Sequence, residues 1–128
     1  MVLSLVDANR VIEGAIAKAA ELNVKVSVAI CDAGGRLIAF QRLDGSILAS
    51  VFASQGKAIT SVTVGRPSGD VTDNPALAGV IAAAGGILIA GKGGVPLVRD
   101  GAVIGACGVA GATWDQDEMC ARSGVECL

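Results

Sequence analysis

The chain has 128 residues, enough for one domain with a substantial hydrophobic core but not for two. Hydrophobic residues make up 52% of the sequence and aromatic residues only 2%, so we expect an aliphatic core and a homo-oligomer that covers the remaining apolar surface. The net charge of −2, without a basic run, gives a nucleic-acid-binding surface no electrostatic support. The absence of His and Tyr removes the commonest general base, the commonest metal ligand and two usual haem ligands.

The first half of the chain is predicted to contain a helix, a β-hairpin and a second helix. The first helix begins at the capping-box-like pair Ser4 and Asp7 and continues with apolar residues at helical spacing. Two strands with β-branched residues are joined by the turn sequence D-A-G-G. The second helix is rich in small residues and carries Lys57. The predicted ranges are 4–23 for the first helix, 24–31 and 36–41 for the strands, and 46–62 for the second helix.

The second half is predicted to contain a short helix, three strands and a last helix. The last two strands are joined by a tight turn at Asp100 and Gly101, and Thr113 is expected to cap the last helix. The predicted ranges are 75–84 and 114–123 for the helices, and 87–90, 96–99 and 102–110 for the strands. Five strands among four helices predict an α+β fold in which helices pack on an antiparallel sheet.

The sequence favours a soluble, cytoplasmic protein with no membrane partner. Its first residues lack the basic region and apolar run of a secretion signal. The uncharged stretch 74–91 is dominated by Ala and Gly, so we interpret it as a helix followed by a strand and not as a membrane span. The four cysteines form no C-x-x-C pair and have no His to complete a zinc site, which indicates free thiols in a reducing compartment.

The stretch G-I-L-I-A-G-K-G-G, residues 86–94, matches most of a phosphate-binding P-loop. That loop needs a Ser or Thr hydroxyl for Mg²⁺ and a helix that follows it. Here Gly93 takes the hydroxyl position, and Pro96 stands where the helix should begin. The four residues between the first two glycines are apolar and favour a buried strand. We therefore predict a central strand and the loop that leaves it, and no nucleotide site.

Six motifs, which together span most of the chain, resemble one protein family. They are A-I-C-D-A-G-G-R-L (29–37), A-F-Q-R-L-D-G (39–45), S-Q-G-K-A-I-T (54–60), G-G-V-P-L-V-R-D-G (93–101), V-I-G-A-C-G-V-A-G (103–111) and W-D-Q-D (114–117). In this order and at these spacings they resemble the GlcG/HbpS family, also called the haem-degrading domain family. That family includes the C-terminal domain of PduO-type cobalamin adenosyltransferases.

The resemblance implies a fold, an assembly and a class of function. The fold is a profilin-like, three-layer α/β/α domain over residues 1–128, with a five-stranded antiparallel sheet. The assembly is a homo-oligomer, from dimer to octamer. The function is the binding of a small molecule or cofactor, and haem is the precedent in the family.

Three charged residues in these motifs are candidates for a site. Lys57 lies between small residues, where packing gives a lysine little purpose. It could anchor an anion or, with a lowered pKa, act as an amine nucleophile, and it could equally be a solvated or salt-bridged lysine. Arg42 and Asp44 flank the end of a strand and could pair with each other, or Arg42 could hold a ligand carboxylate.

The glycine loop and the last helix supply the other candidates. Gly93 and Gly94, ahead of Pro96, permit close backbone approach, so this loop could cradle an anion through its N–H groups or only turn the chain. Asp117 lies in the first turn of the last helix, where the helix dipole favours a carboxylate. The residues form no recognisable metal site.

Two functions of different classes remain open. The first is a binding module that holds a small anionic molecule; its cofactor is unknown, and haem is a candidate for which the chain offers no His or Tyr ligand. The second is a small-molecule enzyme that uses Lys57 and Arg42 with Asp117 as the acidic partner. We favour the binding module and expect Lys57 and the loop 91–96 to line one cavity, with Arg42 on its rim.

Overall fold

The computed structural model describes residues 2–128, in which four α-helices accompany four strands. The bounds are α1 Leu5–Leu22, β1 Ser27–Asp32, β2 Leu37–Arg42, α2 Ala49–Val64, the short 3-10 helix η1 Ser68–Val71, α3 Pro75–Ala83, β3 Gly94–Arg99, β4 Ala102–Ala110 and α4 Trp114–Val125. Each predicted helix is present, and four of the five predicted strands are.

The strands form one antiparallel sheet in the order β2-β1-β4-β3. The prediction of a five-stranded sheet is wrong, because residues 87–90 do not form a strand. The Ile89 N–H donates a hydrogen bond to Thr60 Oγ1 of α2 at 2.8 Å, and the Ile89 side chain fills the space that a side chain at Gly56 would need. The apolar run therefore packs on α2 and does not join the sheet.

The hydrogen bonds at the end of the first helix also explain why the first strand begins three residues later than predicted. Ser4 caps α1 by accepting the Asp7 N–H at 3.0 Å, as the sequence predicts, and Asn23 ends the helix in the left-handed conformation. The Val24 N–H still donates to the Ala19 carbonyl of α1 at 2.9 Å. Because this backbone group is used by the helix end, β1 begins later than predicted.

The last strands and the last helix follow the sequence prediction closely. Asp100 and Gly101 have φ values of 52° and 78°, which form the tight turn between β3 and β4. Thr113 and Gln116 make a complete capping box at the start of α4. The turn and the cap are short-range features, so the sequence alone locates them.

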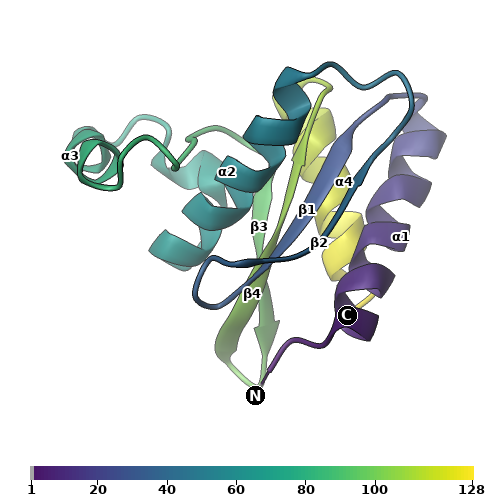
Figure 1. Cartoon of the computed structure of the whole chain (residues 1–128), viewed down its shortest axis with the longest axis horizontal. Coiled ribbons are helices and arrows are strands. Elements are labelled where there is room, and N and C mark those ends of the chain that lie inside the picture. The colour runs from purple at the N-terminus through teal and green to yellow at the C-terminus, as the bar shows by residue number, and fades with distance from the viewer. Residues whose placement is uncertain (1) are drawn as a thin grey trace.

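Helices cover both sides of the sheet and give the molecule three layers. Figure 1 shows α1 and α4 on one side and α2 on the other. Branched aliphatic residues dominate the core between the sheet and the helices α1 and α4, with Val28, Ile30, Val95, Leu97 and Val109 among them. Small residues fill the space between the sheet and α2, with Ala29, Ala58, Ala106 and Gly108 among them. The two sides of the sheet therefore differ in how closely a helix can approach.

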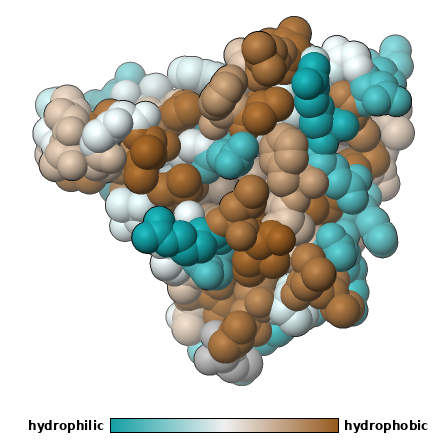
Figure 2. Space-filling model, viewed as in Figure 1, coloured by the Kyte–Doolittle hydropathy of each residue, from teal (hydrophilic) through white to brown (hydrophobic). Residues whose placement is uncertain are grey.

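The segment that contains α3 projects from the three layers (Figure 1). Leu77 is the residue of α3 that is buried, although the whole stretch 74–91 carries no charge. Figure 2 shows hydrophobic surface over the face that this segment shares with α2, where the large exposed apolar side chains include Phe52, Val80 and Ile87. Within residues 2–128, no helix combines the length and the hydropathy that a bilayer crossing requires.

Candidate functional site

A buried ion pair joins α2 to α4. Lys57 Nζ lies 3.0 Å from Asp117 Oδ2, and the two side chains are only 4% and 2% exposed. The ammonium also donates to the Val109 carbonyl of β4 at 3.3 Å. The pair thus connects helices from opposite sides of the sheet, at the point where β4 ends and β3 begins.

Two glycines at the start of β3 make room for this lysine. A Cβ atom on Gly93, whose φ is 137°, would lie 2.9 Å from Lys57 Cδ and 3.0 Å from Nζ. A Cβ atom on Gly94 would overlap the Lys57 carbonyl oxygen. The Gly94 N–H donates to Ser68 Oγ at 2.8 Å, so this group is already used inside the protein. The glycines therefore allow α2 and its lysine to approach the strand closely.

Asp117 is held by the start of α4. Its Oδ1 accepts the Ala112 N–H at 2.9 Å, while Oδ2 accepts from Lys57. Burial raises the pKa of Asp117, although the Lys57 charge and the Ala112 N–H act in the opposite direction. A buried carboxyl group with a shifted pKa and a specific charged partner is a candidate functional group.

A cavity of about 240 Å³ adjoins the ion pair. Both Lys57 and Asp117 line it, and the other lining residues are mostly small or apolar, with Ser50, Ile89 and Trp114 among them. The Trp114 ring packs on Gly91, where a Cβ atom would lie 2.8 Å from the ring. The cavity therefore combines one pair of opposite charges with a largely apolar wall.

The remaining predicted site residues lie elsewhere. Arg42 is exposed and donates to the Ser46 carbonyl at 3.3 Å, Asp44 is exposed, and the ion pairs found among residues 2–128 do not include one between them. Pro96 lines a different hollow. The expectation that Lys57 and the loop 91–96 line one cavity with Arg42 on its rim therefore does not hold. The cavity beside Lys57 is lined neither by Arg42 nor by any residue of that loop, although Gly93 and Gly94 pack against Lys57.

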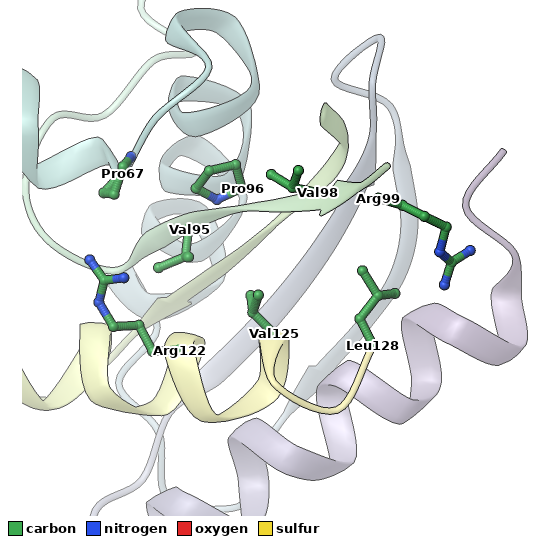
Figure 3. A pocket seen from close by; sticks show the side chains of 8 residues that line it. All are labelled: Pro67, Val95, Pro96, Val98, Arg99, Arg122, Val125 and Leu128. Atoms are coloured by element: carbon green, nitrogen blue, oxygen red, sulfur yellow. The ribbon is translucent and has the colours of Figure 1, made fainter. Parts of the chain in front are cut away.

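That second hollow, an open groove of about 590 Å³, is a feature that the sequence did not predict. Figure 3 shows its apolar floor between β3 and the end of α4, with Arg99 and Arg122 placed at opposite ends. Arg99 pairs with Asp7 at 3.2 Å, and Arg122 pairs with Glu118. Both guanidinium groups have carboxylate partners, as Lys57 has, but their side chains are 32% and 54% exposed, so solvent screens their charges and that of Lys57 is buried.

No cysteine lines either of these two hollows. Cys31, Cys107 and Cys120 are buried, and Cys127 is exposed. Burial raises the pKa of Cys31 and of Cys120 to about 11, which keeps both thiols protonated at neutral pH. Within residues 2–128, no group of three or more His, Cys, Asp or Glu side chains is placed to hold a metal ion.

Comparison with known proteins gives the family. The model of the family described as "Haem degrading protein HbpS-like" matches residues 3–126. Protein GlcG of Escherichia coli is 35% identical over 112 residues, which cover 85% of this chain and 81% of GlcG. Corrinoid adenosyltransferase PduO of Salmonella typhimurium is 29% identical over 98% of this chain, and the matched part is 39% of that protein.

Solved structures of the same family agree with the fold. The crystal structure of HbpS is 31% identical, has a TM-score of 0.92 and is matched over 100% of this chain and 91% of that one. The structure named as the PduOC:heme complex is 29% identical, also with a TM-score of 0.92, over 100% of this chain and 96% of that one. The resemblance seen in the motifs is therefore confirmed, and the chain belongs to the family of HbpS-like haem-degrading proteins.

Proposed function

We propose that this chain is a cytoplasmic, homo-oligomeric protein that binds a small anionic molecule in the cavity beside Lys57 and Asp117. The observation that carries the proposal is the ion pair itself, because burying charge is costly and the pair lines a cavity. An ammonium group has three N–H donors, and two acceptors for it are found within residues 2–128. The third donor is available to an oxygen atom of a ligand.

The raised pKa of Asp117 explains how an electrically neutral pair could accept an anion. If Asp117 takes up a proton, Lys57 keeps its charge and an anion can replace the carboxylate as its partner. The protonated fraction of Asp117 grows as the pH falls, so anion binding should strengthen on acidification. The cavity of about 240 Å³ is smaller than the usual sites for drug-sized ligands, which run from about 300 Å³ upward. We therefore expect a metabolite of a few carbon atoms.

Haem is suggested by the family and by the haem complex of PduOC, and its iron would need an axial ligand from this chain. The sequence has no His and no Tyr, neither the groove nor the cavity beside Lys57 is lined by Cys or Met, and Cys31 lines only a space of about 20 Å³. Three of the four cysteines are buried in the core. These residues do not fit an axially ligated haem, so the proposal is for a small organic anion.

Oligomer formation is proposed from the apolar surface. Ile47, Leu48, Phe52, Val80 and Ile87 are all large and exposed, and they lie on or near α2 and the α3 segment. Association of two or more copies would cover them. Size-exclusion chromatography with light scattering should give a mass well above that of the monomer, and a Val80→Asp substitution should lower it. A wild-type monomer at micromolar concentration would contradict this part of the proposal.

The ligand proposal is tested by thermal unfolding of the purified protein with acetate, lactate and pyruvate. A bound anion should raise the Tm as its concentration rises. The rise should be lost in Lys57→Met and kept in Lys92→Met, a matched control, because Lys92 pairs with Asp115 at the surface at 2.7 Å. Hemin titration, followed by absorbance, should give no stoichiometric Soret band. A tight thiolate-type spectrum, or a Tm that no carboxylate moves, would count against the proposal.

A further inference from the structure

Lys57 lines the cavity of the proposed function, and a reaction of this lysine with a ligand rests on that function. Lys57 Nζ already donates a hydrogen bond to Asp117 Oδ2 across 3.0 Å, so the base that must remove its proton is in place. A neutral lysine amine is a nucleophile for carbonyl carbon. Both side chains are nearly completely buried, at 4% and 2% exposed, so bulk water does not separate the donor from the acceptor.

From this geometry we propose that Lys57 forms an imine with small 2-oxo acids, and that Asp117 carries the protons. A 2-oxo acid is a small organic anion of the proposed class, and it adds the carbonyl group that an amine attacks. Short members of this class fit the cavity volume of about 240 Å³ and its small lining side chains.

The step balances without any other reactant. Asp117 Oδ2 accepts a proton from Nζ, the nitrogen lone pair attacks the carbonyl carbon, and the carbonyl electrons move to its oxygen, which Asp117 then protonates. In the second stage Asp117 accepts another proton from the nitrogen and gives it to the hydroxyl group, which leaves as water while the C=N bond forms. The ammonium has then given two protons, the carbonyl has given its oxygen, and Asp117 is again ionised opposite a protonated imine.

The cavity that Lys57 lines gives such an adduct a place. On the side of Gly93 the lysine end is closely packed, since a Cβ atom there would lie 3.0 Å from Nζ, so an adduct must extend into the cavity that Lys57 lines. The lining residues Ala53, Ala90 and Ala112 are also small. A purely structural ion pair would require no cavity beside it.

The experiment treats the purified protein with pyruvate and cyanoborohydride and maps the product by peptide mass spectrometry. The reduced adduct adds the mass of one pyruvic acid less one oxygen atom. It should form at Lys57 faster than at Lys92, should be absent from that peptide in Lys57→Arg, and should be unaffected at Lys57 by Lys92→Arg. Arginine keeps the positive charge opposite Asp117 but cannot form an imine under these conditions.

Asp117→Asn keeps the shape of the side chain but removes the base, so labelling of Lys57 should slow on the order of 100-fold. Circular dichroism and Tm confirm that each variant is folded before labelling. Labelling of Lys57 no faster than that of Lys92 would overturn the inference. If pyruvate still raises the Tm of the wild type, the binding proposal survives that result; if pyruvate and the other carboxylates leave the Tm unchanged, the proposed function fails as well.

Discussion

The two sides of the sheet are built from different kinds of residue. The core between the sheet and the helices α1 and α4 contains buried aliphatic side chains such as Ile12, Val28 and Leu97, with cysteine and alanine between them. The side that faces α2 contains alanine, glycine and buried hydroxyl groups, and it includes Lys57. Ser27 of β1, for example, shares a 2.8 Å hydrogen bond with Ser50 of α2.

Because of this difference, one side of the sheet supplies most of the apolar burial and the other side carries the candidate functional site. Branched side chains on one side bury a large apolar area, which is the dominant favourable term in folding. On the other side, the absence of large side chains brings the α2 backbone close to β4 and β3 and leaves polar groups to satisfy each other. The ion pair and its cavity therefore lie at the margin of the polar side, on a frame that the apolar side holds together.

Breaking the ion pair should have the largest effect of any single change. Removal of one partner leaves the other buried and unpaired, so Lys57→Met should lower the free energy of unfolding by about 3–5 kcal/mol. Replacing both, as in Lys57→Met with Asp117→Leu, should recover most of that loss while binding of carboxylates stays absent. Urea unfolding measures both. A single variant as stable as wild type would show that the pair is not held as described.

The loss of stability in Lys57→Met should depend on pH, and it should be smaller at low pH. Burial raises the pKa of Asp117, and loss of the Lys57 charge raises it further. An acid whose pKa is higher in the folded state binds its proton more tightly there, so this contribution to stability is complete at low pH and is lost as the pH rises through the folded pKa. Lys57→Met should therefore be less destabilised at about pH 5 than at about pH 8.

A core substitution on the other side should lower stability without changing the site. Leu97 is fully buried in the aliphatic core, and Leu97→Ala should cost about 3 kcal/mol through lost burial and the cavity it leaves. At a temperature where the variant is folded, the pyruvate adduct at Lys57 should form at the wild-type rate. A parallel loss of labelling would mean that the two sides of the sheet are not energetically separate.

A side chain placed between α2 and the sheet should lower the free energy of unfolding by a smaller amount. A Cβ atom on Gly108 would overlap the Ser54 carbonyl oxygen and lie 2.7 Å from the Ala58 nitrogen, both backbone atoms of α2. Gly108→Ala should therefore displace the helix and cost about 1–3 kcal/mol. Gly34→Ala is the matched control, because its nearest neighbour would be Asp32 Oδ1 at 3.4 Å. Equal stability of the two variants would contradict the close contact.

Sequence reasoning succeeded where the signal is local and failed where it depends on distant segments. The cap at Ser4 and the turn at Asp100 are set by neighbouring residues, so the sequence locates them. The apolar run 87–90 has the composition of a strand, but nothing local indicates that Ile89 packs on α2.

The candidate site, too, could be predicted only in part, because its residues are far apart in the sequence. A lysine among small residues marks Lys57 as unusual, yet its partner Asp117 is 60 residues away and also fits an ordinary helix start. The W-D-Q-D motif was the signal that could have linked Asp117 and Trp114 to a common place, and the structure sets both beside Lys57. The groove with Arg99 and Arg122 brings together residues from β3 and α4 that no spacing in the sequence connects.

The smallest effect is expected from thiol labelling, which compares the two sides without changing either. Cys127 is exposed and should react with iodoacetamide first, and Cys127→Ser should leave the Tm unchanged. Burial raises the pKa of Cys31 to about 11, so on the order of 0.1% of it is thiolate at pH 8, and burial also raises the pKa of Cys107. Both thiols are buried, so they can react only after the structure opens locally or unfolds.

The two buried cysteines lie on opposite sides of the sheet. Cys31 lies on the side that faces α2, whereas Cys107 lies in the aliphatic core. Cys31 should therefore react when α2 moves away, and Cys107 only on global unfolding. Peptide mass spectrometry over time gives the order, and equal rates for Cys31 and Cys107 would mean that the sheet opens on both sides at once.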